Sequence, residues 1–237
     1  MPLVFVYNDK KIFLISKIQY NTPFYLLFLL MMKKFKINLT ILYVIFSLIL
    51  IYYSPSNREY LYLNNIGTLF LLFLMIIDIQ KEVLSKPGFI GLLGFSVLHS
   101  IGACYLYQDV PYNEWMIYLF DFDFNSFFGF ERNHFDRLVH FFFGFLLLSS
   151  SRDLIIKLSE FNPKQALFVA FLSIQAFSMI YELFEWSLTI FLSDGMSDSY
   201  NGQQGDNWDA HKDMALAMLG SILAFLLLRG KQDTHKS

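Results

Sequence analysis

The chain has 237 residues, of which 55% are apolar, and a mean hydropathy of +0.44, and these values exclude an ordinary soluble domain of this size. The net charge of −2 and the lack of a basic stripe interleaved with aromatic residues exclude a phosphate-backbone binder, so we expect no nucleic acid partner. The single cysteine, Cys104, lies inside an apolar run, which excludes an internal disulfide and a cysteine-rich metal site.

The N-terminal stretch does not make a convincing membrane span. Lysines interrupt its apolar residues, and Pro23 leaves only a short run behind it. Met31 or Met32, followed by three lysines and a clean apolar run, is a better start for the protein than the first residue is. We therefore interpret residues 1–31 as an N-terminal extension, either a peripheral helix or the product of a misplaced start codon, and residues 32–237 as one membrane domain.

Six apolar runs reach or approach the ~20 residues that a helix needs to cross ~30 Å of hydrocarbon. Their apolar residues are continuous rather than alternating, which indicates helices and not the strands of a barrel. Proline and charge signals mark the loops between them. The expected fold is all-α, a polytopic transmembrane helix bundle of about six spans, at residues 38–54, 62–79, 88–107, 135–150, 165–192 and 209–228.

Basic residues flank alternate ends of these spans, and this asymmetry predicts their orientation. The opposite loops contain only Arg58, Arg132 and Arg137, with many acidic and aromatic residues. Because cytoplasmic loops carry the excess of lysine and arginine, both termini are expected in the cytoplasm. The basic side consists of Lys33, Lys34, Lys36, Lys81, Lys86, Arg152, Lys157, Lys164, Arg229, Lys231 and Lys236.

Polar residues gather at the predicted outer ends of the last three spans. At the start of the fourth span, the i, i+4 spacing puts Asp136 and His140 on one helix face with Gly144 below them. Such a pair suits carboxylate and imidazole ligands, or an acid that orients a base. Arg137 and His134 are expected to point elsewhere, at the level of the lipid headgroups.

The fifth span carries a polar stripe on an otherwise apolar helix. Gln175, Ser178, Glu182 and Glu185 recur at intervals of three, four and three residues, so they share one face. This face must lie against protein or water, because lipid would not solvate it. Two carboxylates a turn apart repel each other, and a shared cation or proton would relieve the repulsion.

The last span opens with aspartates. Asp206, Asp209 and Asp213 share a face that continues as Ala217 and Gly220. The acids would therefore sit above a seam of small residues, which allows two helices to approach closely.

Each of these groups also has a simpler structural interpretation. Asp206 and Asp209 would cap the last helix and complement its dipole, Asp136 would pair with a neighbouring arginine, and the two glutamates would be solvated. His99, in the outer half of the third span, can point into the same cluster or make a helix-to-helix hydrogen bond. A functional site is favoured by the coincidence that three helices present carboxylates or an imidazole at one membrane depth, where ionisable groups are costly.

Four segments carry a resemblance to known proteins: HSIGACYLY at 99–107, RNHFDRLVH at 132–140, YELFEW at 181–186 and QGDNWDAHKDM at 204–214. From about residue 38 onward, the chain resembles the YjdF-type family of uncharacterised bacterial inner-membrane proteins. The resemblance implies a multi-pass protein of the bacterial cytoplasmic membrane. Cys104 stands where the family more often has histidine, which weakens a metal site completed by the third span, and His211 stands where it often has glutamine.

A more distant likeness is one of pattern. An Asp-x-x-x-His at one helix start, an acidic pair on the next helix and aspartates opening the last helix are similar to the VanZ-like glycopeptide-resistance membrane proteins. Neither family supplies a settled reaction.

We predict a membrane enzyme, or enzyme-like protein, with an outward-facing site. The predicted catalytic residues are Asp136, His140, Glu182, Glu185, Asp209 and Asp213. All of these except Asp209 are candidate ligands of Mg²⁺, Mn²⁺ or Zn²⁺, because carboxylate and imidazole groups without thiolates suit these cations. The metal would activate water for hydrolysis or group transfer on a lipid-linked or envelope substrate. Secondary candidates are Asp206, His99, Arg137 and His134.

Two other functions stay open. A cation- or proton-coupled transporter would place its acids at the membrane midplane between broken helices, whereas these acids lie near one face and no span has a Gly or Pro interruption in its middle. A structural or partner-binding membrane protein would use the polar cluster only to fix helix packing. In that case the isosteric amides of Glu185 or Asp213 would leave function intact.

Overall fold

The computed structural model describes residues 23–56, 58–191 and 204–234. Within these ranges six helices are long and apolar enough to cross a membrane, which confirms the predicted all-α fold. A helix suits this environment because it satisfies its own backbone hydrogen bonds. The long helices are α2 (Pro23–Tyr53), α3 (Arg58–Lys81), α4 (Lys86–Tyr105), α7 (Phe135–Leu158), α8 (Pro163–Phe191) and α10 (Asp209–Thr234).

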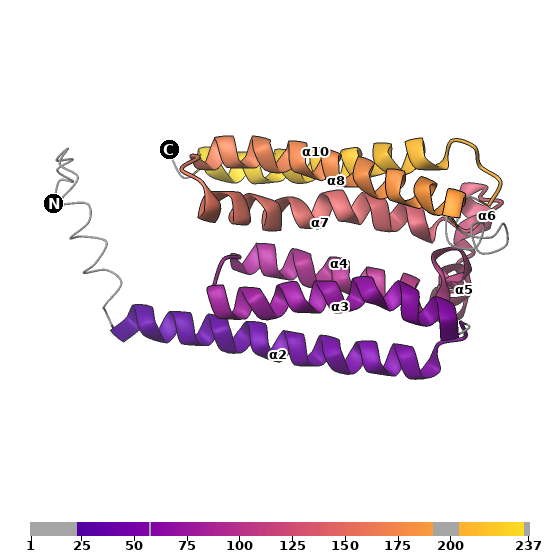
Figure 1. The fold of residues 1–237 in the computed structure, drawn as a ribbon, viewed down its shortest axis with the longest axis horizontal. Helices are drawn as coiled ribbons and strands as arrows, with labels where there is room; N and C mark the ends of the chain where they lie inside the picture. The colour runs from indigo at the N-terminus through magenta and orange to yellow at the C-terminus, as the bar shows by residue number, and fades with distance from the viewer. Residues whose placement is uncertain (1–22, 57, 192–203, 235–237) are drawn as a thin grey trace.

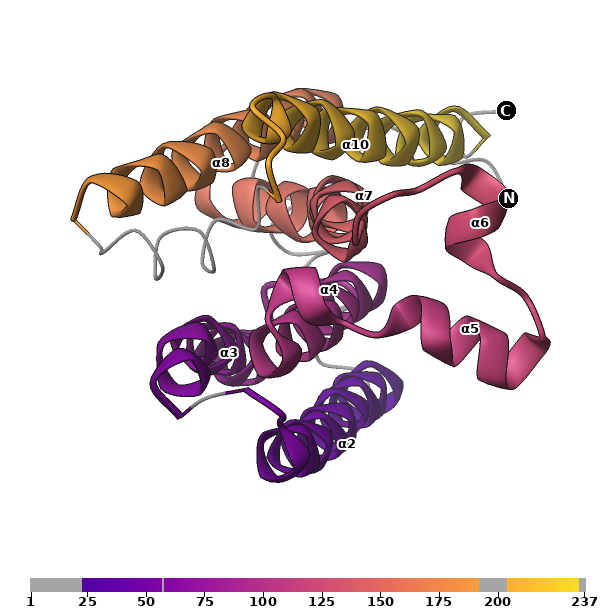
Figure 2. The same cartoon turned by 90° about the vertical axis from the view of Figure 1, so that its right-hand side faces the viewer.

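The long helices form two layers of three (Figures 1 and 2). Helices α2, α3 and α4 contact one another in the first layer, α7, α8 and α10 in the second, and the contact of α4 with α7 joins the layers. The helices alternate in direction, so the starts of α7 and α10 and the end of α8 lie at one end of the bundle (Figure 1). The three helices expected to carry the site therefore meet there.

Three short helices connect α4 to α7 at this same end: η1 (Tyr107–Asp109), α5 (Tyr112–Phe120) and α6 (Phe124–Phe128). Asp123 caps α6 by accepting the backbone N–H of Ser126 at 2.9 Å, and Gly129 ends α6 in the left-handed conformation at φ 66°. The sequence predicted only a loop here, because these helices are too short to show a span. We call this end of the bundle the α5–α6 end.

The observed helices differ from the predicted spans at some ends. Helix α2 begins at Pro23 rather than near residue 38 and runs without a break through Met31. Helix α7 continues to Leu158, beyond the predicted end at residue 150. The remainder of the proposed N-terminal extension, residues 1–22, lies outside the described residues, so the boundary at residue 32 stays a prediction.

Helices α7 and α10 approach each other closely along small residues. A Cβ atom built on Gly144 of α7 would collide with the backbone carbonyl of Ala217 on α10, and one built on Gly220 would collide with the carbonyl of Phe141. Only glycine fits where two backbones come this close. The predicted seam of small residues is confirmed, and it brings together the polar first turns of the two helices.

A buried ion pair holds the opposite end of the first layer. The Nζ of Lys36 donates to Oδ2 of Asp78 at 2.6 Å and to the carbonyl of Leu84 at 2.7 Å. The other oxygen of Asp78 accepts the backbone N–H groups of Val83 and Leu84 at 3.0 and 2.7 Å. This network fixes α2, α3 and the connection to α4 with its charges compensated.

Candidate functional site

Side chains from α7, α8 and α10 converge at the α5–α6 end. Asp136, His140 and Asp213 are buried, and one ligand atom from each lies within 4.8 Å of the others. The Nε2 of His140 lies 3.6 Å from Oδ1 of Asp136 and 3.5 Å from Oε1 of Glu182. The expected meeting of three helices is confirmed, and we call these four residues the Asp–His cluster. Its role as a site stays a prediction.

The helix register explains the cluster. Asp136 lies in the first turn of α7, His140 lies one turn later on the same face, and Gly144 follows at the close contact with α10. Asp213 occupies the matching place on α10, one turn before Ala217. The glycine contact therefore sets the distance between the polar residues of the two helices.

Several oxygen atoms in or beside the cluster have no hydrogen-bond partner within the described part of the chain. These atoms are Oε1 of Glu182, Oδ1 of Asp213 and Oγ of Ser178, one turn before Glu182 on α8. Glu182 is 7% exposed and Asp213 is 2% exposed. A buried acceptor without a partner costs ~1–3 kcal/mol, and more when it is charged. A cation held by Asp136, His140 and Asp213 would lie beside these oxygens and lower that cost.

The distances in the cluster suit a small divalent cation. Oxygen and nitrogen ligands bind Mg²⁺ or Zn²⁺ at about 2.0–2.2 Å, so two ligands on opposite sides of one ion lie roughly 4.2 Å apart. The ligand atoms of Asp136, His140 and Asp213 span up to 4.8 Å. The separation of these atoms is therefore close to that of ligands around one small ion.

Two arginines bind the aspartates at the start of α10. Nη1 of Arg132 lies 2.8 Å from Oδ1 of Asp209, and Nη2 of Arg137 lies 3.2 Å from the same atom and also binds Asp206. Asp209 is 3% exposed, so both arginines compensate a buried charge. Arg137 does not join Asp136 and His140, because its long side chain reaches Asp206 and Asp209 instead. Its expected place at the level of the lipid headgroups stays a prediction.

Asp206 has the geometry of a structural cap. Its carboxylate accepts Nζ of Lys212 at 2.6 Å and the backbone N–H of Trp208 at 3.1 Å, in addition to Arg137. The hydrogen bonds from Lys212 and Trp208, with that from Arg137, hold the pKa of Asp206 well below its usual range. The simpler interpretation of Asp206, as a charged capping residue, is therefore supported.

His134 lies among the arginines. Its Nδ1 accepts from Nη1 of Arg137 at 3.1 Å, and its ring packs on Phe130 with centroids 4.0 Å apart. Burial, together with the nearby cations of Arg137 and Arg132, lowers the pKa of His134 to about 4. The imidazole is therefore neutral at neutral pH, and it acts as an acceptor for Arg137.

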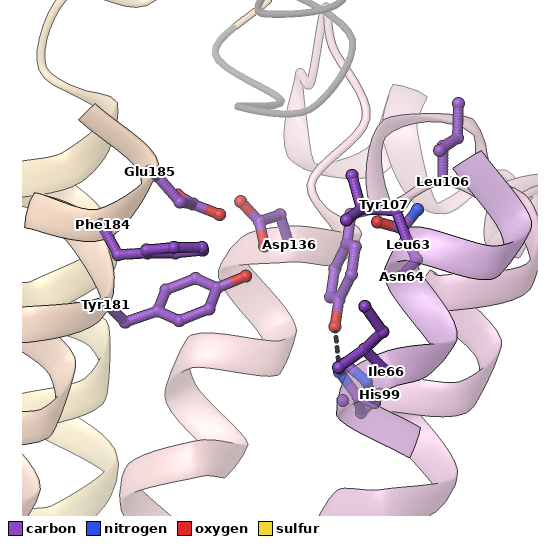
Figure 3. Close-up of a pocket in the computed structure, with 11 residues that line it drawn as sticks. Leu63, Asn64, Ile66, His99, Leu106, Tyr107, Asp136, Tyr181, Phe184 and Glu185 are labelled. Atoms are coloured by element: carbon purple, nitrogen blue, oxygen red, sulfur yellow. Dashed lines mark hydrogen bonds between the residues drawn. The ribbon is translucent and has the colours of Figure 1, made fainter. Parts of the chain in front are cut away.

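Glu185 and His99, which we also expected near the cluster, line a cavity beside it. The cavity has a volume of about 260 Å³ and lies between α3 and α4 on one side and α7 and α8 on the other (Figure 3). The carboxylates of Glu185 and Asp136 point toward each other across it. Nδ1 of His99 is hydrogen-bonded to the Tyr107 hydroxyl at 2.6 Å. Asp136 therefore belongs to both the cluster and the cavity.

The sequence did not identify the aromatic side chains of the cavity. Tyr107, Tyr181 and Phe184 line the cavity wall. One signal was available, because Tyr181 and Glu185 are four residues apart and therefore share a helix face.

Comparisons with known proteins place the chain among membrane proteins. A family model described as "Predicted membrane protein (DUF2238)" matches residues 36–234. The chain is also similar to "Inner membrane protein YjdF" of Escherichia coli (strain K12), at 29% identity over 134 residues. That match covers 56% of this chain and 60% of the relative, which is less than two thirds of the relative's length. No solved structure matches.

Proposed function

This chain belongs to the DUF2238 family of predicted membrane proteins, and we propose that it is a metal-assisted membrane enzyme. It would hydrolyse a lipid-linked or envelope substrate, or transfer a group to or from one. The observation that carries the proposal is the convergence of Asp136, His140 and Asp213, next to carboxylate oxygens that are buried without hydrogen-bond partners among the described residues. Groups of this kind inside a membrane protein are costly unless they bind something.

The residues of the Asp–His cluster divide into two roles. Asp136, His140 and Asp213 would hold a Mg²⁺, Mn²⁺ or Zn²⁺ ion, and such an ion would supply a water of lowered pKa and would polarise an oxygen of the substrate. Glu182, whose Oε1 lies 3.5 Å from Nε2 of His140, would accept the proton of that water. Asp209 and the arginines would fix the start of α10, so that Asp213 faces α7.

The proposed location is the bacterial cytoplasmic membrane, with both termini in the cytoplasm and the cluster facing outward. The location in this membrane is supported by the similarity to a relative that is named as an inner membrane protein. The orientation is supported by the basic residues near the helix ends opposite the α5–α6 end, because cytoplasmic ends carry the excess of positive charge. They include Lys81, Lys86, Arg152, Lys157, Lys164 and Arg229.

The test is elemental analysis of the detergent-purified protein and four amide variants, one of them a control. We expect about one equivalent of metal in the wild type, loss of metal in Asp136→Asn and Asp213→Asn, and retention in Glu182→Gln, since a base is not a ligand. Glu114→Gln, which removes an exposed acid on α5, is the matched control and should retain metal.

A purely structural cluster gives the opposite pattern. Without a cation, Asp213→Asn removes a buried carboxylate whose Oδ1 has no partner among the described residues, so the variant should unfold at a higher temperature than the wild type. If the wild-type protein binds no stoichiometric metal and Asp213→Asn is stabilised, the proposal is wrong.

A further inference from the structure

The cavity beside the Asp–His cluster is apolar at its mouth. Ile66 and Leu63 of α3 and Phe184 of α8 line it, and they are 61%, 41% and 48% exposed. Both helices are membrane spans, so the faces that they expose meet lipid. Helices α3 and α8 lie on the same side of the two layers (Figure 2). The cavity therefore opens sideways toward the bilayer, between α3 and α8.

The inner end of the cavity is acidic and aromatic. The carboxylates of Asp136 and Glu185 point into the same space, next to the ring of Phe184 and the hydroxyl of Tyr181 (Figure 3). The lining includes these two acids and, within the described residues, no lysine or arginine. Carboxylates and aromatic rings together attract organic cations, through charge and through the negative faces of the rings.

The size of the cavity limits what can enter. Its volume of about 260 Å³ lies just below the ~300–1,000 Å³ of pockets that enclose a drug-sized ligand. A head group and the first carbons of a chain would fit inside it. The remainder of a long hydrocarbon tail would lie in the bilayer, along Leu63 and Ile66.

We propose that this cavity binds the ammonium head of an amphiphile that enters sideways from the bilayer. Asp136 and Glu185 would hold the ammonium group, and the aromatic side chains would pack around it. If the amphiphile is also the substrate of the Asp–His cluster, that part of the proposal rests on the proposed function. The binding itself requires no metal.

The test uses the full chain in lipid nanodiscs with photoreactive dodecyl probes that carry an ammonium, a phosphate or a hydroxyl head. We expect the ammonium probe to label α3 and α8 around the cavity in preference to the other two. Labelling should fall about tenfold in Glu185→Gln, because a charge-assisted hydrogen bond is lost. Labelling of the lipid-facing residues Leu42 and Leu48 of α2 provides the internal control and should not change.

Two further variants distinguish a failure of the proposed ammonium site from a failure of the proposed metal site. Ile66→Trp fills the mouth from an exposed position, so it should reduce labelling around the cavity without affecting folding. Asp213→Asn removes a proposed metal ligand outside the cavity lining and leaves the carboxylate of Asp136, which the two proposed sites share, without a competing cation. Labelling should therefore not fall in this variant although metal is lost, so the ammonium site and the metal site can fail separately.

Competition identifies the source of the ammonium group. Unlabelled dodecylammonium should displace the probe, whereas soluble ethylammonium at the same concentration should not. Equal labelling by the three heads, preference for the phosphate head, or equal displacement by ethylammonium would each overturn the proposal.

Discussion

Adding one methyl group at Gly144 should weaken both the helix bundle and the proposed metal site. In Gly144→Ala, the new Cβ would lie 2.8 Å from the carbonyl carbon of Ala217 and 2.9 Å from the backbone nitrogen of Ser221, and closer still to the carbonyl oxygen of Ala217. Non-bonded carbon contacts are optimal near ~3.5–4.0 Å, so α7 and α10 must separate by about 1 Å. A backbone group cannot rotate away as a side chain can.

The magnitude follows from two opposing terms. Overpacking costs ~1–3 kcal/mol, whereas a helical Gly→Ala change gains up to ~1 kcal/mol of helix propensity. We expect a net loss of about 2 kcal/mol, which corresponds to ~4–8 °C in the unfolding temperature of a chain of this size. Metal ligands tolerate about ±0.2 Å, so metal affinity should fall at least ~10-fold although no ligand has changed.

Thermal unfolding in detergent and metal titration of the same samples measure the two effects. Gly230→Ala is the matched control, because it makes the same chemical change on α10 where a Cβ meets nothing within 4 Å. It should be neutral or slightly stabilising, and its metal affinity should equal that of the wild type. If Gly144→Ala behaves like Gly230→Ala in both measurements, the close contact does not set the geometry of the cluster.

Two other predictions concern regions outside the cluster. The pKa of His134 is about 4 in the folded protein and 6.5 for an unperturbed histidine, so the unfolded chain binds the proton first as the pH falls. The contribution of the neutral His134 to the free energy of unfolding is therefore complete above pH 6.5 and declines toward pH 4. His134→Gln should lack this pH-dependent contribution, so the unfolding temperatures of the variant and the wild type should differ by different amounts at about pH 7 and pH 4.5. The same difference at both pH values would contradict the prediction. Lys36→Met leaves Asp78 buried without its cation, so denaturant unfolding should show a loss of ~3–5 kcal/mol, whereas a loss below about 1 kcal/mol would refute the role of the pair.

The spans and their polar faces were readable from the sequence because both depend on local periodicity. A continuous apolar run of about 20 residues has few alternatives to a membrane helix. The spacing of Asp136 and His140, and of Asp213 and Ala217, fixes which side chains share a face. In each helix the apolar residues face lipid, so the polar face turns toward the interior of the bundle. The polar faces of the three helices therefore meet there.

The sequence did not show how the acids divide between partners. Arg137 follows Asp136 directly, and helix geometry alone turns its side chain away from the cluster. Its partners, Asp206 and Asp209, lie about 70 residues later, just before α10 and at its first residue, so their position depends on how α10 packs on α7. Glu185 and His99 likewise line the cavity rather than join the cluster, because their direction depends on the contact between the two layers.

The division of the acids is itself the strongest argument for a site. Asp206 and Asp209 lie at the same end of the bundle as Asp213, and each has arginine partners at ion-pair distance. Asp213 and Glu182 are buried much as Asp209 is, yet each keeps an oxygen without a hydrogen-bond partner among the described residues, and that oxygen of Glu182 lies 3.5 Å from Nε2 of His140. A fold that needed only to hold α10 against α7 already does so with the arginines and the glycine seam. The remaining carboxylates are buried with incomplete hydrogen bonding, which costs free energy and is the arrangement expected of groups that bind a cation or a substrate.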